Sequence, residues 1–164
     1  MIINPRLPTG FVIFSDDLRQ EVTGKIIIVG AYSHDMIFTQ PPPVILPQLV
    51  ASIWYRLSPE EVPSSIEFRV VFETADEEPA VFYSHLLDLT KEELPTGAPS
   101  PDANAVPYLE ITHVAQLSNL VIAKPGSLRV RAYFDDNEVR LGTIMLNFPP
   151  PEVTPNSSSA EISV

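Results

Sequence analysis

Three histidines carry the side chains best suited to acid–base catalysis or metal binding: His34, His85 and His113. No two of them show the H-x-x-x-H or H-E-x-x-H spacing, so a zinc site would need ligands from distant parts of the chain. His85 and His113 both fall in apolar registers of strands that we expect to be neighbours. If they face each other they could form a metal or acid–base pair. A hydrogen-bonded histidine in a core or interface is the commoner outcome, and we favour that interpretation.

Paired aspartates in two predicted turns suggest a second kind of chemistry. Asp16-Asp17 and Asp135-Asp136 would offer oxygen ligands to Ca²⁺ if both turns lay at the same end of a C2-like sandwich. The sequence contains the oxygens but does not determine whether the turns converge. We therefore interpret these residues as exposed turn acids, with calcium binding as the weaker alternative.

Other signatures of catalysis are missing from the sequence. The absence of cysteine excludes a disulfide framework, a thiolate zinc site, a thiol nucleophile and an iron–sulfur cluster. The glycines never fall close enough together for a phosphate-binding loop, and no serine lies in a G-x-S-x-G motif. We therefore predict no catalytic, cofactor-binding or metal residues, and we expect a protein that is not an enzyme.

Composition limits the kinds of partner. A formal net charge of −11 with only ten lysines and arginines argues against binding to nucleic acid. No window approaches the roughly 18 apolar residues that a membrane helix needs, so we expect no membrane partner. The first ten residues lack the pattern of a signal peptide, and a cytoplasmic location is the simplest expectation.

The elements that position these residues are read from hydrophobic periodicity. The 18 prolines leave few windows for a helix of ordinary length. Strands are predicted at 11–15, 25–31, 36–39, 48–57, 66–73, 81–89, 108–117, 128–134 and 140–148. About eight or nine strands predict an all-β fold, an antiparallel β-sandwich of immunoglobulin-like or C2-like type. We expect an irregular lead-in at 1–10, one domain at 11–148 with a long loop at 90–107, and a polar, proline-rich tail at 149–164.

Two of these strands carry specific expectations. The run at 26–29 is apolar on both faces, so we expect a central strand with Ile27 among the most buried residues. In 48–57, alternation places Tyr55 and its odd-numbered neighbours toward the core, and Trp54 with Arg56 on the other face. We favour a Trp54 that is roofed by residues 41–43 or 95–107. The alternative is that Trp54 and Arg56 bind a partner protein.

Short motifs resemble a known family. They are FSDDLRQE at 14–21, GKI at 24–26 and VGAY at 29–32, with NL at 119–120 and PG at 125–126 farther along. Together they resemble a family of uncharacterised small bacterial and phage proteins, catalogued as a domain of unknown function. The resemblance spans roughly residues 11–148. It implies a β-sandwich and implies no activity.

These observations favour a non-catalytic module that binds another protein through its loops or an edge strand. The resemblance supports a second hypothesis, a structural or accessory component of a phage or related assembly. An enzyme and a Ca²⁺-binding C2-like domain rank lower, because no nucleophile–base pair or metal cluster is legible in the sequence.

Overall fold

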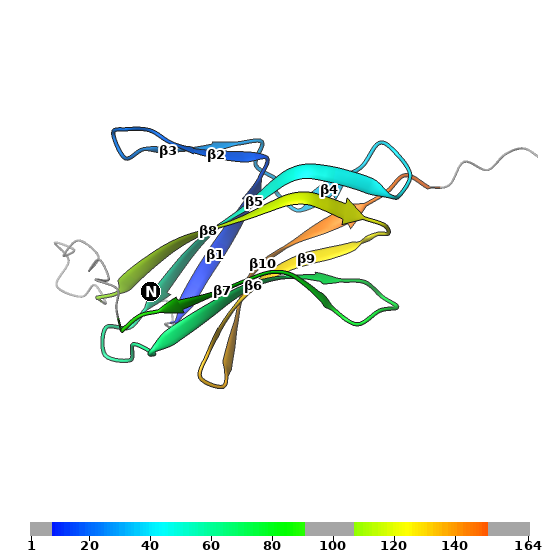
Figure 1. The fold of residues 1–164 in the computed structure, drawn as a ribbon. Coiled ribbons are helices and arrows are strands. Elements are labelled where there is room, and N and C mark those ends of the chain that lie inside the picture. Colours follow the sequence, from blue (N-terminus) through cyan, green and yellow to red (C-terminus); the bar gives the residue numbers. More distant parts are fainter. Residues whose placement is uncertain (1–7, 91–106, 151–164) are drawn as a thin grey trace, which may run out of the picture.

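The computed structural model describes residues 8–90 and 107–150, which form ten strands (Figure 1). The strands are β1 Thr9–Ser15, β2 Asp17–Gln20, β3 Ile26–Val29, β4 Asp35–Ile37, β5 Val44–Leu57, β6 Ser65–Glu73, β7 Ala80–Asp88, β8 Leu109–Ile122, β9 Gly126–Phe134 and β10 Asn137–Asn147. No helix in this part of the chain is long and apolar enough to cross a membrane. Most of the predicted loop, the start of the lead-in and the tail from residue 151 onward lie outside the described residues.

Two sheets form a sandwich. One has the order β1-β5-β8 and the other the order β4-β10-β9-β6-β7, while β2 and β3 pair only with each other. Pairing is antiparallel throughout except between β4 and β10, which run parallel. Figure 1 shows the three-stranded sheet lying over the five-stranded one, and β1 makes close contact with β10. The predicted β-sandwich is therefore confirmed, with one parallel pair at its edge.

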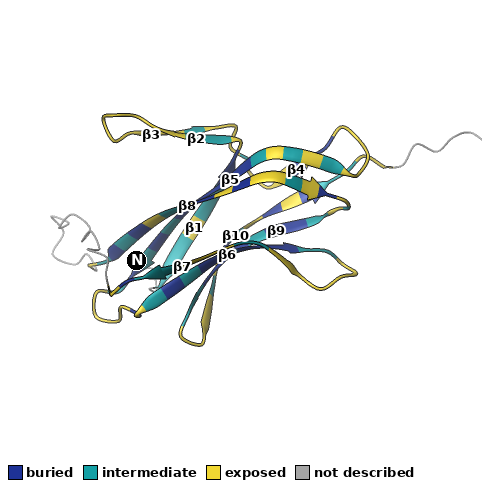
Figure 2. Cartoon of the chain, viewed as in Figure 1, coloured by how far each residue is buried: buried dark blue, intermediate teal, exposed yellow. Residues whose placement is uncertain are grey.

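The core lies between the facing sides of these sheets, where strand alternation brings every second side chain inward. Figure 2 shows this layer as dark blue stripes that alternate with lighter ones. The inward residues of β5 follow the predicted register and are almost fully buried: Leu49, Ala51, Ile53, Tyr55 and Leu57. From the other sheet, β6 and β9 contribute another buried set: Ile66, Phe68, Val70, Leu128, Val130 and Ala132.

The strands β5 and β8 extend beyond the predicted 48–57 and 108–117. In both strands the alternation of inward and outward side chains reverses at one point, and the prediction stopped there. Asn119 has a φ of 54°, a left-handed conformation that asparagine tolerates better than most residues. The ladder pairs Leu46 with Leu120 and resumes with Gln48 opposite Ser118, on either side of this point. Leu46 and Leu120 therefore pack against the core although simple alternation from Leu49 and Leu117 would direct them outward.

The prediction that Ile27 is deeply buried is wrong. Ile27 lies in β3, which pairs only with β2, and it is 42 % exposed. Figure 1 shows the β2–β3 hairpin standing off from the body of the sandwich, so neither larger sheet covers the apolar run. An apolar run marks a strand that favours burial, but burial also requires a neighbouring layer, which the chain path does not supply here.

Two further local predictions need correction. The strand predicted at 81–89 does not alternate regularly at its start, because a bulge between Tyr83 and Val81 leaves Val81 54 % exposed and lets Phe82 pack on the core. The predicted lead-in is also too long, since β1 already begins at Thr9.

Candidate interaction face

An aromatic pair occupies the outer face of the three-stranded sheet. Phe11 of β1 lies directly opposite Trp54 of β5 in the antiparallel ladder. Their rings stack with centroids 5.1 Å apart and planes 12° apart. Phe11 is 47 % exposed and Trp54 is partly buried, so the pair presents an apolar surface to solvent. The predicted outward direction of Trp54 is confirmed.

The prediction that a loop of the chain covers Trp54 is wrong for residues 41–43. Residues 41–43 precede β5, and a strand advances about 3.3 Å per residue, so they lie roughly 35 Å along the chain from Trp54. Most of the other candidate roof, 95–107, lies outside the described residues. One face of the indole is covered instead by Phe11, which the sequence did not single out.

The apolar surface continues into the next row of the ladder. Ile13, Ser52 and Val114 lie side by side across β1, β5 and β8. Val114 is 39 % exposed, whereas the small Ser52 is completely buried among larger neighbours. We call Phe11, Ile13, Trp54 and Val114 the Phe11–Trp54 face.

Polar contacts border this face at both ends. Beyond Trp54, Arg56 donates from Nε to Glu110 at 2.9 Å, and its guanidinium lies 4.5 Å from the ring centroid of Tyr108. At the other end, the Gln116 amide donates to Gln48 at 3.2 Å. An apolar centre with a polar rim is the usual anatomy of a protein interface. Arg56, the second predicted partner-binding residue, therefore lies at the rim, held by contacts within its own chain.

The β2–β3 hairpin adds a second exposed apolar group, because Ile26, Ile27 and Val29 are each at least 40 % exposed. Its base is fixed by close local contacts. The Tyr32 hydroxyl donates to Asp16, and burial together with Asp16 raises the pKa of Tyr32 to about 12. Gly30 has a φ of +66°, and a Cβ there would collide with the Asp16 carboxylate. Only glycine therefore fits this position.

The histidine pair considered from the sequence is brought together. The rings of His85 and His113 stack with centroids 4.7 Å apart, and Nε2 of His113 is hydrogen-bonded to the Tyr83 hydroxyl at 2.9 Å. The other side of His113 stacks on Phe68. Burial, with a smaller effect of His85, lowers the pKa of His113 to about 4. The favoured hydrogen-bonded interpretation is confirmed for His113, and the ring is held neutral near pH 7.

The two acidic turns do not meet. Asp16 follows the last residue of β1, whereas Asp135 lines a pocket with Pro8, just before the first residue of β1. The turns therefore lie at opposite ends of a strand of seven residues, roughly 25 Å apart. In the described ranges, 8–90 and 107–150, no three His, Asp or Glu side chains are placed to hold a metal ion. The calcium cage considered from the sequence does not form.

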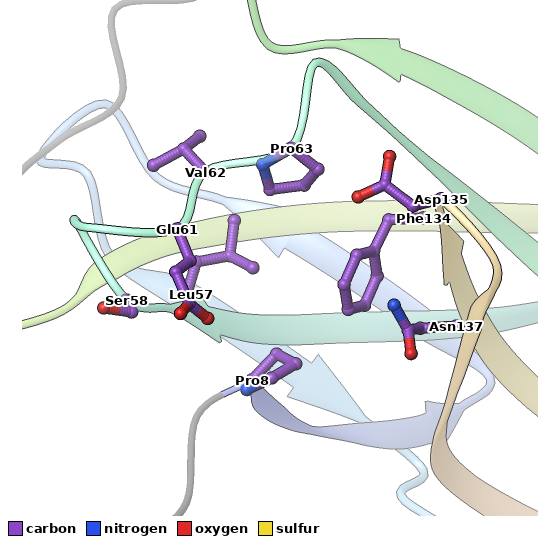
Figure 3. A pocket seen from close by; sticks show the side chains of 9 residues that line it. All are labelled: Pro8, Leu57, Ser58, Glu61, Val62, Pro63, Phe134, Asp135 and Asn137. Atoms are coloured by element: carbon purple, nitrogen blue, oxygen red, sulfur yellow. The ribbon is translucent and has the colours of Figure 1, made fainter.

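Figure 3 shows the side chains that line a pocket at this end of the sandwich. The volume of the pocket is about 340 Å³. Pro8, Leu57 of β5 and Phe134 of β9 meet two carboxylates there, those of Glu61 and Asp135, beside the amide of Asn137. The Ser58 hydroxyl accepts a hydrogen bond from the Glu60 amide and thereby closes the turn after β5. The lining therefore offers carboxylate and amide hydrogen-bond acceptors, while the Ser58 hydroxyl oxygen is engaged within its own turn.

The fold and this face define an all-β sandwich with an exposed aromatic surface. The chain belongs to DUF6941, a family of unknown function, whose family model matches residues 10–146. The match covers both sheets of the sandwich, and the predicted membership of a domain family of unknown function is confirmed. No curated protein matches the chain.

Proposed function

We propose that this protein is a non-catalytic interaction module that binds another protein through the Phe11–Trp54 face. The observation that supports the proposal is the stacked, solvent-facing pair of Phe11 and Trp54 on a regular sheet. Aromatic residues with few rotatable bonds contribute much of the energy at protein interfaces, where they lie near the centre of the contact.

The rim favours a partner with an apolar centre and flanking polar groups. Arg56 and Glu110 already neutralise each other, so the face carries little net charge for a long-range electrostatic attraction. Binding would therefore depend mainly on apolar burial and only weakly on salt.

The test is retention of a partner from a lysate of the native host. Immobilised wild-type protein is compared with Trp54→Ala and Phe11→Ala, and with Ile45→Ala as the matched control. Ile45 lies on the same strand as Trp54 and is 63 % exposed, but it lies outside the face. A protein retained by the wild type and the control but lost from both aromatic variants supports the proposal; equal retention by all four contradicts it.

Light scattering on the purified chain distinguishes the proposed interaction module from the alternative, a structural component of an assembly. A discrete ring or tube that forms from this chain alone would favour the assembly. A monomer that retains a different protein favours the interaction module.

A further inference from the structure

The outer face of the five-stranded sheet carries three arginines in one row. Arg69 of β6 lies directly opposite Arg131 of β9, which in turn lies directly opposite Arg140 of β10. Arg129 lies on the same face two residues before Arg131. Like charges directly opposite each other on neighbouring strands destabilise a sheet. The row therefore has a cost in stability that the fold itself does not require.

Glutamates on the same strands offset part of this repulsion: Glu67, Glu73 and Glu138. Glu73 accepts from Arg129 at 2.7 Å and from Arg131 at 3.0 Å. Glu138 contacts Arg131 at close range and lies 3.6 Å from Arg140. The four arginines outnumber these three glutamates, on a chain whose formal net charge is −11.

The arginines differ in how many donors remain available. Both terminal nitrogens of Arg131 are used by glutamates, and its side chain is only 10 % exposed. The Arg140 side chain is 82 % exposed, and its distance to Glu138 is longer than a hydrogen bond. Arg129 is 40 % exposed; it donates from one terminal nitrogen to Glu73 and from Nε to Ser127 at 3.3 Å, which leaves its other terminal nitrogen. Arg140 and Arg129 can therefore still donate to a ligand.

A groove of about 260 Å³ lies among these side chains. It is lined by Arg129, Val130, Arg131, Arg140, Gly142 and Thr143, and no carboxylate belongs to the lining. The ladder shifts by one residue between Arg140 and Gly142, so a β-bulge interrupts the strand at the groove. Three arginines from β9 and β10, together with Thr143, thus line one hollow.

We propose that this groove binds a single oxyanion group, a phosphate or a carboxylate of a small ligand. A guanidinium presents paired N–H donors that match two oxygens of such a group, and a hydroxyl can add a third hydrogen bond. A bound anion would also offset the repulsion along the arginine row. The site lies on the opposite side of the sandwich from the Phe11–Trp54 face and does not depend on it.

The test is a calorimetric titration with inorganic phosphate, and separately with succinate, at constant ionic strength set by chloride. The wild type is expected to bind one of them saturably, and the preferred anion identifies the source of the oxyanion. Arg140→Gln is expected to weaken binding at least tenfold. Arg140→Lys should weaken it less, because it keeps the charge but loses the paired donors. Arg19→Gln is the matched control, since Arg19 is also exposed and paired with a carboxylate, Asp17, but lies on β2.

A second measurement follows folding in the same variants. Arg140→Gln relieves the repulsion opposite Arg131, so in chloride its melting temperature should equal or exceed that of the wild type. The saturating anion should raise the melting temperature of the wild type and of Arg19→Gln but leave Arg140→Gln almost unchanged. Binding that does not saturate for either anion, or that is equal in Arg140→Gln and Arg19→Gln, would overturn the proposal.

Discussion

The imidazole of His113 lies between the rings of His85 and Phe68, with centroid separations of 4.7 and 5.3 Å. His113 comes from β8 and the other two from β7 and β6, so this stack joins the two sheets where their edges come close. A protonated imidazole is poorly tolerated there because the site is desolvated and faces a second histidine.

Acid should therefore weaken the fold through His113. The folded protein binds this proton only near pH 4, whereas the unfolded chain binds it near pH 6.5. Stability is then fully present above pH 6.5 and falls as the pH drops from 6.5 toward 4. After allowance for its partial exposure, this group should contribute a loss of roughly 1–2 kcal/mol.

Urea unfolding between pH 7 and pH 4.5 measures this loss. His113→Gln keeps a hydrogen-bonding group near Tyr83 but cannot titrate, so its stability should fall less steeply with acid than that of the wild type. His34→Gln is the control, since His34 is exposed and lies outside the stack. Equal slopes for His113→Gln and the wild type would contradict the assignment.

Ile27 and Ile53 should respond very differently to truncation. Ile53 is completely buried between the sheets, so Ile53→Ala should cost about 2–5 kcal/mol. Ile27 is 42 % exposed on a two-stranded hairpin, and Ile27→Ala should cost less than about 1 kcal/mol. Chemical denaturation of the two variants measures both values, and a cost for Ile27→Ala close to that of Ile53→Ala would show that the hairpin is covered in solution.

Removal of the Tyr55 hydroxyl should not weaken the protein. This hydroxyl is buried and has no hydrogen-bond partner among the described residues, and burial raises the pKa of Tyr55. Tyr55→Phe should therefore leave stability unchanged or raise it by about 1 kcal/mol. Tyr32→Phe is the comparison, because it removes the hydrogen bond to Asp16 and should cost about 1 kcal/mol. A clear loss on Tyr55→Phe would reveal a partner for the buried hydroxyl.

Tryptophan fluorescence reports on the Phe11–Trp54 stack directly, since Trp54 is the only tryptophan. Phe11→Ala uncovers one face of the indole, so the emission should shift to the red and quenching by iodide should increase. The lost stacking should lower stability by about 0.5–1.5 kcal/mol. Ile45→Ala should change neither signal; an unchanged spectrum in Phe11→Ala would mean that the rings do not stack in solution.

Local alternation was enough to predict much of the sandwich. In β5 the odd-numbered residues from Leu49 to Leu57 are buried and Trp54 points outward, as the period of two requires. The same reasoning holds for Phe68 and Val130 on the opposite sheet. It fails where a bulge or a left-handed residue changes the phase, as at Phe82 and Asn119, because such irregularities depend on strand partners.

The sequence by itself determined that the chain is all-β, that Trp54 faces away from the core, and that its ionisable residues lack the spacing of known catalytic motifs. Only the tertiary structure decided which side chains meet. The apolar run containing Ile27 is exposed because no layer covers its hairpin. Phe11 reaches Trp54, and Arg69 reaches Arg131, through antiparallel registers between segments more than 40 residues apart. Local preferences set the direction of a side chain on its strand, but register and sheet order set its neighbours, and these depend on the packing of the whole chain.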